Sequence, residues 1–374
     1  MTWPVVLTSG GPRERGRAYG LAAAARIGSS LALYEAVFRR YADITWADAR
    51  DRAGAFVDAI DAYDVELIPE IEGIAEGASV DAEDVLALNL RTEVMFGLDD
   101  RPSSVPRECT ALAVADVPGG PIVAQNWDWK PAVRETCVIL ACAPRGRPRF
   151  VTIVEAGLLA KFGLNDHGLA LATNALTSSR DHGEPGVPYH AVLRRILTSA
   201  TFDEAVAAVT QPTRASSANY LIGSADGRLV DLEVTPGGPE ASSASSGSRL
   251  AYANHFTWPA PRGFRDVGRV DGEDSVRRHA AAEAAITTSE PTLEDVRRVL
   301  RDHEGQPSSV CAHADPDVHP VDDYVTVASF VAALGSHRAW ITDGNPCERP
   351  FEALDLEGLF GDAGDADTTA TAAP

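Results

Sequence analysis

The sequence of 374 residues has little cysteine and almost no lysine. Its five cysteines are scattered without a CxxC pair: Cys109, Cys137, Cys142, Cys311 and Cys347. An odd number in this arrangement argues against a disulfide framework. Lys130 and Lys161 are the only lysines among 33 basic residues, which face 54 acidic residues for a net charge of −21. Such a charge excludes a broad phosphate-binding surface, so we expect neither nucleic acid nor an anionic membrane as a partner.

Targeting and common catalytic motifs are also missing. The N-terminus lacks a basic region followed by an apolar run, and no stretch approaches the ~18 apolar residues that span a bilayer. We therefore expect a cytoplasmic protein. The motifs G-x-x-x-x-G-K-[ST], G-x-S-x-G, H-E-x-x-H and S-x-x-K do not occur. The sequence thus excludes several familiar nucleotide-binding and hydrolase mechanisms.

Metal-ligand residue types are concentrated in one short segment. Cys311, His313 and His319 are zinc-type ligands, and Asp315 and Asp317 lie between them. A structural zinc site normally draws on paired ligand clusters, and this pattern offers a single one. The sequence therefore favours a polar loop with no metal, and no cofactor is expected.

Hydrophobic periodicity predicts helices first, then many strands mixed with helix pairs. Helical spacing covers 27–41, 53–63, 81–89, 189–197, 203–209, 274–286 and 292–303. Strand patterns cover 110–117, 121–127, 137–142, 150–155, 168–174, 220–223, 229–234, 325–334 and 339–342. Strand runs segregated from helix runs predict an α+β or layered fold with mostly antiparallel sheets. Residues 99–108 read as an exposed irregular segment, 236–248 as a mobile loop and 361–374 as a disordered tail.

Cys109 stands at the start of a predicted strand, directly after the Pro/Ser-rich segment. A cysteine there can act as a nucleophile if the preceding peptide bond is cut. The freed α-amino group, with a reference pKa of about 7.7–8.0, then serves as the base for its own thiol. The alternative is a buried strand cysteine that behaves as a small hydrophobic residue.

The residues around Cys109 resemble those of a known family. Glu-Cys-Thr-Ala at 108–111, followed by Gln-Asn-Trp-Asp at 125–128, is similar to the nucleophile hairpin of the acyl-CoA:6-aminopenicillanate (isopenicillin N) acyltransferase family. These are self-cleaving N-terminal-nucleophile (Ntn) hydrolases. The resemblance extends over nearly the whole chain, through short strings in the family's order at 15–20, 70–78, 163–170, 217–220, 254–256, 302–305 and 344–347.

This resemblance implies an α+β fold, namely a four-layer αββα Ntn-hydrolase sandwich with mostly antiparallel sheets. It also implies that the Glu108–Cys109 bond breaks by an N-to-S acyl shift. The products would be a helical chain of 108 residues and a catalytic chain of 374 − 108 = 266 residues, covering 1–108 and 109–374. The two would remain associated as one domain.

The resemblance also assigns roles to individual residues. Cys109 is the nucleophile, and Asp128 holds its amino group. Asn254 matches an oxyanion-hole asparagine, and Asn174 is a second candidate for holding the scissile carbonyl or the substrate. Without the resemblance, Asp128 could be a strand-end acid and both asparagines ordinary strand-end residues.

Two departures from the family pattern bear on activity. Glu108 stands where the penicillin enzyme has glycine, which affects the rate of cleavage, and residues 324–329 lack the family's arginine. The missing charge argues against an acidic substrate such as the penicillin nucleus. The implied function is hydrolysis of a linear amide of a small N-acyl or aminoacyl amine through a thioester. One alternative is acyl transfer to an amine from an amide or from acyl-CoA as co-substrate. The other is an uncleaved binding protein in which Cys109 is inert.

Overall fold

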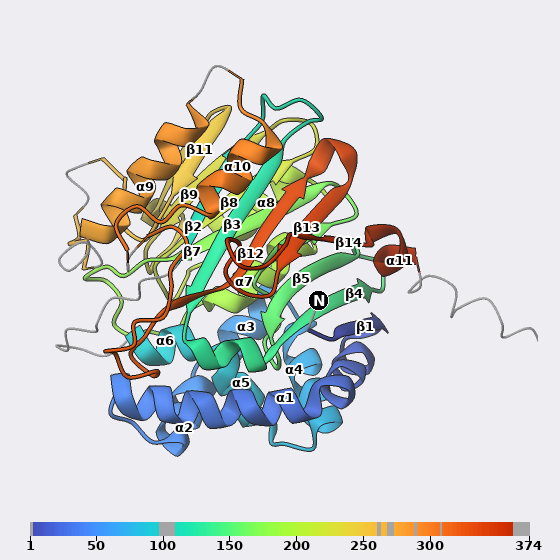
Figure 1. Ribbon diagram of the computed structural model, residues 1–374. Coiled ribbons are helices and arrows are strands. Elements are labelled where there is room, and N and C mark those ends of the chain that lie inside the picture. Colours follow the sequence, from blue (N-terminus) through green and yellow to red (C-terminus); the bar gives the residue numbers. More distant parts are fainter. Residues whose placement is uncertain are drawn as a thin grey trace, which may run out of the picture.

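A computed structural model describes residues 3–96, 109–259, 263–267, 273–287, 290–306 and 309–361 (Figure 1). The segment 99–108, including Glu108, and the tail beyond Gly361 lie outside the described residues. The described residues before Cys109 form helices α1 Pro12–Tyr41, α2 Trp46–Gly54, α3 Val57–Tyr63, α4 Leu67–Ala78, α5 Ala82–Asn89 and α6 Arg91–Phe96. The helical patterns predicted over 27–41, 53–63 and 81–89 lie within this set, whereas α4 and α6 were not predicted. The helical pattern predicted over 53–63 divides between α2 and α3, which are separate helices.

Helices α1 and α4 approach each other through glycines. A Cβ atom on Gly20 would lie 2.0 Å from the carbonyl oxygen of Ile74, and one on Gly73 would lie 2.3 Å from that of Arg13. Both distances are far below a van der Waals contact. Any side chain at these positions would therefore force the two helices apart.

A buried ion cluster also joins these helices to a later part of the chain. Glu70 of α4 accepts hydrogen bonds from Arg15 Nε at 2.8 Å and from both terminal nitrogens of Arg194 at 2.9 Å. All three side chains are buried. Arg194 belongs to α7 (Tyr189–Leu197), so the cluster connects residues on either side of Cys109.

Helix α1 is the one described helix long and apolar enough to cross a membrane, with a mean hydropathy of 1.2 over its most apolar 18 residues. This corrects the expectation that no such stretch exists. The core helix of a globular fold passes the same test of length and composition. Ile27, Tyr34 and Phe38 of α1 are fully buried in the main hydrophobic core, so packing within the fold accounts for the apolar face.

Two sheets form the centre of the molecule. The eight-stranded sheet has the order β1-β4-β5-β6-β7-β8-β9-β10, and the six-stranded sheet has the order β11-β2-β3-β12-β13-β14. Among the pairings between these strands only that of β1 with β4 is parallel. Their bounds are β1 Val5–Gly10, β2 Thr110–Val114, β3 Ile122–Trp129, β4 Cys137–Pro144, β5 Phe150–Glu155, β6 Phe162–Asn165, β7 Leu169–Ala175, β8 Ala218–Ser224, β9 Leu229–Val234, β10 Ser242–Ser246, β11 Arg249–Tyr252, β12 Val325–Ala333, β13 Arg338–Thr342 and β14 Glu352–Leu354.

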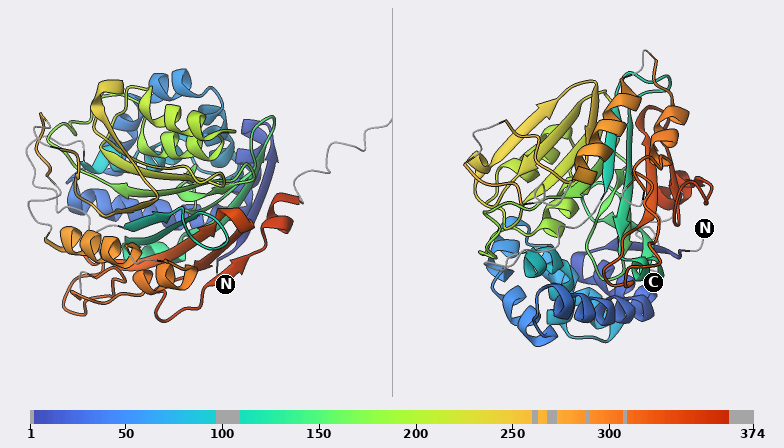
Figure 2. Two further views of the ribbon diagram at one scale, coloured as in Figure 1. Left: turned by 90° about the horizontal axis from the view of Figure 1, so that it is seen from above. Right: turned by 60° about the vertical axis from the view of Figure 1, so that its left-hand side comes forward.

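Helices cover the outer faces of both sheets (Figure 2). Helices α7 and α8 (Phe202–Thr210) pack on the eight-stranded sheet, and α9 (Glu273–Ile286) and α10 (Leu293–Leu300) pack on the six-stranded sheet. The inner faces of the two sheets contact each other through β2 and β3 on one side and β7 and β8 on the other. The expected four-layer αββα sandwich with mostly antiparallel sheets is therefore confirmed.

Several sequence-based predictions need correction. The stretch 236–248 was expected to be a mobile loop, but it contains a short 3-10 helix at Pro239–Ala241 and strand β10, which pairs with β9 at the sheet edge. Its serines and alanine carry no apolar alternation, because an exposed edge strand needs none. The short elements β1, β6, β11, β14 and α11 (Leu356–Gly361) were not predicted either.

Candidate active site

Cys109 immediately precedes β2 and is 1% exposed. Its φ angle is +53°, in the left-handed region that a residue with a Cβ rarely adopts. Such a conformation costs on the order of 1 kcal/mol or more and persists only when surrounding contacts impose it. The candidate nucleophile is therefore held in a strained backbone conformation.

Two side chains hold the main-chain carbonyl of Cys109. Asn174, near the end of β7, donates from Nδ2 at 3.0 Å, and Arg278 of α9 donates from a terminal nitrogen at 2.7 Å. Both side chains are buried. Asn174 comes from the opposite sheet and Arg278 from the outer helix layer, so three layers of the sandwich meet at the nucleophile.

Arg278 connects Cys109 to Asn254. Its second terminal nitrogen donates to Asn254 Oδ1 at 3.0 Å, and the first also donates to the Thr110 hydroxyl at 3.1 Å. The Nδ2 group of Asn254 donates to the carbonyl of Ala175 at 3.0 Å, and its main-chain N–H donates to Ser275 Oγ at 2.7 Å. Because an amide nitrogen carries two hydrogens, Asn254 retains the chemistry required of an oxyanion donor.

Asp128 is brought to the same place by the β2–β3 hairpin. Thr110 pairs with Asn126, and continuing this register by one residue places Cys109 opposite Trp127, with Asp128 next along β3. On its other side β3 pairs with β12, which has an irregularity at Val327 that brings Thr326 opposite Asp128. The Thr326 hydroxyl donates to Asp128 Oδ1 at 2.6 Å.

Burial raises the pKa of Asp128 to about 6, although the positive charge of Arg278 and the Thr326 hydrogen bond act to lower it. A carboxyl group with this pKa changes protonation close to neutral pH. The group can therefore bind a neighbouring ammonium as a carboxylate and respond to its charge.

The structure thus brings together the residues predicted from sequence. Cys109, Asn174 and Asn254 share one hydrogen-bond network. Asp128 lies close enough to Arg278 for the positive charge of the guanidinium to lower its pKa. Asn174 contacts the carbonyl of Cys109 itself. Glu108 lies outside the described residues.

Arg278 is the central residue that the sequence reasoning missed. Its side chain lies on the buried stripe of α9, which also contains Ser275, Ala282 and Ile286 at intervals of three and four residues. An arginine within an otherwise small and apolar helical stripe was the available signal.

Trp127, Trp129 and Trp258 all belong to the main hydrophobic core or pack against it. Trp127 and Trp129 are buried, and the Trp129 indole donates to the hydroxyl of Tyr34 at 2.9 Å. Trp258 is half-buried and packs edge-on against Phe264.

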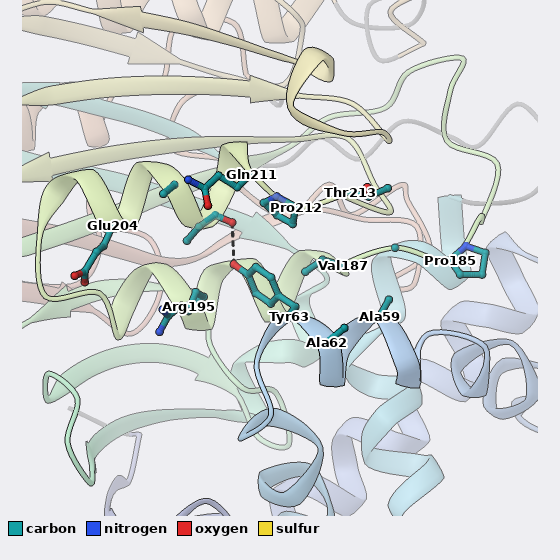
Figure 3. A pocket seen from close by; sticks show the side chains of 13 residues that line it. Ala59, Ala62, Tyr63, Pro185, Val187, Arg195, Glu204, Gln211, Pro212 and Thr213 are labelled. Carbon is teal, nitrogen blue, oxygen red and sulfur yellow. Dashed lines mark hydrogen bonds between the residues drawn. The ribbon is translucent and has the colours of Figure 1, made fainter.

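A separate hollow of about 660 Å³ lies between α3, the segment 185–187, α7 and α8 (Figure 3). Tyr63 points across it and donates to the carbonyl of Ala208 at 2.8 Å. None of Cys109, Asp128, Asn174 and Asn254 lines this hollow.

Comparison with known proteins places the chain in a family. The sequence model of the acyl-coenzyme A:6-aminopenicillanic acid acyl-transferase family matches residues 116–347, a stretch that includes Asp128, Asn174, Asn254 and Arg278 and begins after Cys109. The acyl-coenzyme A:6-aminopenicillanic-acid-acyltransferase 40 kDa form of Emericella nidulans is 31% identical over 245 residues, which are 65% of this chain and 66% of that protein.

Two solved structures show more distant similarity. A mutant of conjugated bile acid hydrolase from Clostridium perfringens has 12% identity and a TM-score of 0.45, over 68% of this chain and 94% of that one. Penicillin V acylase from Agrobacterium tumefaciens has 15% identity and a TM-score of 0.37, over 63% and 83% of the two chains. By the extent of the family match, the chain belongs to the acyl-coenzyme A:6-aminopenicillanic acid acyltransferase family.

Proposed function

We propose that this protein is a self-processing Ntn cysteine amidohydrolase that cleaves a linear amide of a small N-acyl or aminoacyl amine. The observation that carries the proposal is the network on the carbonyl of Cys109, in which Asn174 and Arg278 hold the nucleophile and Arg278 also holds Asn254. A buried structural cysteine would require no such network.

Self-cleavage would begin with attack of the Cys109 thiol on the carbonyl carbon of residue 108. The C–N bond breaks, a thioester forms, and the thiol proton passes to the new amino group. Water then hydrolyses the thioester, leaving a carboxylate on residue 108 and a free thiol on Cys109. The left-handed φ of Cys109 supports this step, because an N-terminal residue has no φ angle and scission relieves the strain.

Substrate hydrolysis would use the amino group released by that step. The amino group takes the thiol proton, the thiolate attacks the amide carbonyl, and the leaving amine receives the proton. Asn254 is the candidate to stabilise the oxyanion, a contribution typically worth about 3–4 kcal/mol of barrier. Water hydrolyses the resulting thioester. Asp128 would orient the ammonium through its charge.

Acyl transfer is the second candidate, and membership of the acyl-coenzyme A:6-aminopenicillanic acid acyltransferase family favours it. In this reaction an amine replaces water at the thioester, and acyl-CoA can supply the acyl group. Once the thioester on Cys109 has formed, the two reactions differ only in the acceptor, which depends on whether the acyl-enzyme excludes water. Purified enzyme given an acyl thioester and a panel of amines separates them. Amide formation faster than thioester hydrolysis would overturn the hydrolase proposal.

Intact mass under denaturing conditions tests the self-cleavage directly. We expect two chains of 108 and 266 residues from the wild type and one chain from Cys109→Ala. Cys137→Ala is the matched control, because Cys137 is also a buried free cysteine but lies on β4. The control should be cut as the wild type is. A wild-type chain of full mass would support the uncleaved binding protein and reject this mechanism.

A further inference from the structure

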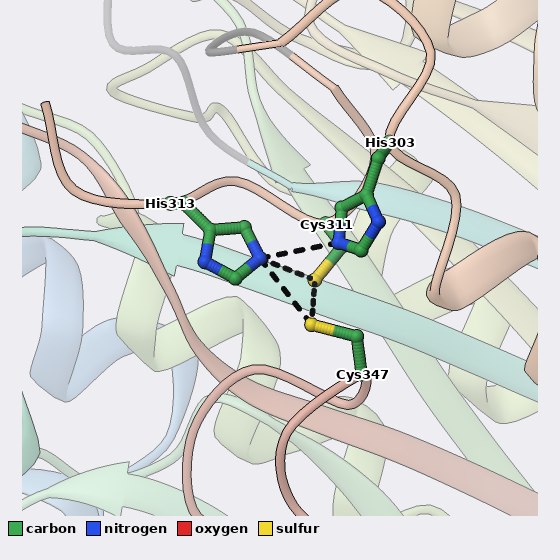
Figure 4. Close-up of side chains that lie close together, drawn as sticks. All are labelled: His303, Cys311, His313 and Cys347. Carbon is green, nitrogen blue, oxygen red and sulfur yellow. Dashed lines mark hydrogen bonds between the residues drawn. The ribbon is translucent and has the colours of Figure 1, made fainter.

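Four cysteine and histidine side chains converge at a place separate from the Cys109 network (Figure 4). His303 follows α10, Cys311 and His313 precede β12, and Cys347 follows β13. Each offers one ligand atom, and the four atoms all lie within 4.8 Å of one another. The cluster therefore joins three separate segments of the chain, which follow α10, precede β12 and follow β13.

Four of the six distances between ligand atoms are close to those of a tetrahedral zinc site, and all six lie within 4.8 Å. With Zn–S of about 2.3 Å and Zn–N of about 2.05 Å, tetrahedral geometry requires roughly 3.8 Å between sulfurs, 3.5 Å between sulfur and nitrogen, and 3.3 Å between nitrogens. The Sγ atoms of Cys311 and Cys347 are 3.5 Å apart, and their distances to His313 Nε2 are 3.7 and 3.3 Å. The Nε2 atoms of His303 and His313 are 3.1 Å apart.

Neighbouring groups orient these ligands in the manner typical of metal sites. The Asn345 side chain donates from Nδ2 to Cys311 Sγ at 3.4 Å and to the carbonyl of Ala312 at 2.6 Å. Nδ1 of His313 lies 3.5 Å from a carboxylate oxygen of Glu348. A proton on Nδ1 would point to this carboxylate, which leaves the Nε2 lone pair facing the cluster.

We propose that His303, Cys311, His313 and Cys347 bind one Zn²⁺ ion as a structural site. Four protein ligands complete a tetrahedral shell and leave no position for a reactive water. Two thiolates neutralise the ion, and binding releases two thiol protons to solvent.

The ligand set differs from the one considered from sequence. Cys311 and His313 are retained, but His303 and Cys347 take the place of His319 and the intervening aspartates. The Nδ1 atom of His319 instead accepts a hydrogen bond from the main-chain N–H of Val321 at 3.3 Å.

Hydrogen bonds through Ala312 and Thr326 connect the proposed zinc site to Asp128. Ala312 lies between two ligands, and its main-chain N–H donates to the Thr326 hydroxyl at 2.9 Å. The main-chain N–H of Thr326 donates back to Ala312 at 2.9 Å, and the same hydroxyl donates to Asp128. Zinc would thus fix Ala312 and, through it, the orientation of the hydroxyl that contacts Asp128.

Metal analysis of the full chain tests the site. After dialysis, elemental analysis should find about one zinc per chain in the wild type and less than about a tenth of that in Cys347→Ser or His303→Ala. His319→Ala is the matched control and should retain the zinc. Replacement by Co²⁺ should give the visible absorption of a tetrahedral ion and a near-ultraviolet thiolate-to-cobalt band, both lost in Cys347→Ser.

The same samples distinguish a zinc site from a metal-free cluster, from a disulfide and from zinc bound elsewhere on the chain. Cys109→Ala should bind zinc as the wild type does, so a failed self-cleavage proposal leaves this one intact. A wild-type chain with all five thiols reduced that takes up no added Zn²⁺ would overturn the proposal. So would a Cys311–Cys347 disulfide found in protein purified without reductant, or zinc retained by both ligand variants.

Discussion

Replacing Arg278 with methionine tests the central contact of the candidate site. The guanidinium is buried and donates at 2.7 Å to Cys109, at 3.1 Å to Thr110 and at 3.0 Å to Asn254. Methionine fills much of the same volume but donates none of these bonds. Breaking a buried charged network typically costs about 3–5 kcal/mol, because the remaining polar groups lose their partner. A misplaced nucleophile costs about 100-fold in kcat/KM.

The substitution should also change the pH dependence. Arg278 acts to lower the pKa of Asp128, which burial raises to about 6. Without the positive charge the pKa of Asp128 rises further, so a higher pH is needed to ionise it. The acid limb of the kcat/KM profile should move to higher pH, and raising the pH should restore part of the lost activity.

The assay compares pH profiles of kcat/KM for the wild type, Arg278→Met and Arg277→Met. Arg277 is the exposed neighbour on the same helix, so its variant controls for loss of one positive charge. The control should follow the wild type. An Arg278→Met enzyme with an unmoved acid limb, or with one at lower pH, would refute the assigned link between Arg278 and Asp128.

Two further substitutions test stability. The first is made in an uncut Cys109→Ala background. There the pKa of Asp128 is about 6 in the folded state, above its reference value of 3.8. The carboxyl group therefore destabilises the fold as it ionises, by up to about 3 kcal/mol as the pH rises from 4 to 6. Asp128→Asn should remove this pH dependence in denaturant titrations, and an unchanged pH slope would contradict the assigned burial. Gly20→Ala should lower Tm by several degrees, because its Cβ would lie 2.0 Å from the Ile74 carbonyl oxygen. On Gly28 an added Cβ would meet no atom within 4 Å outside its own stretch of helix, so Gly28→Ala should leave Tm equal or higher. Equal behaviour of the two alanines would refute the close-packing argument.

Local patterns made the fold largely predictable from sequence. The hairpin that carries Asp128 was predicted because alternating strand patterns flank a turn at Pro118-Gly119-Gly120. The observed strands β2 and β3 begin within one residue of the predicted ranges 110–117 and 121–127. The edge strand β10 was not predicted, since its serines carry no alternating pattern.

Contacts between distant residues were harder to predict than the elements. Arg278 is 169 residues from Cys109 in sequence, and on a helix an arginine resembles a solvated surface residue. His303 and Cys347 are separated from Cys311 by 8 and 36 residues, so the ligand spacing does not match a compact zinc motif. Only the packing of α10, β12 and β13 brings these side chains together.

The buried ion cluster around Glu70 becomes a contact between two polypeptides if the chain is cut before Cys109. Arg15 and Glu70 would then belong to one polypeptide and Arg194 to the other, so the same ion pairs would hold a two-chain complex. Unfolding would become a dissociation, and its midpoint would depend on protein concentration. We expect denatured wild-type protein to refold with a yield that rises with concentration. Uncut Cys109→Ala should refold with a rate independent of concentration, since all its partners remain on one chain.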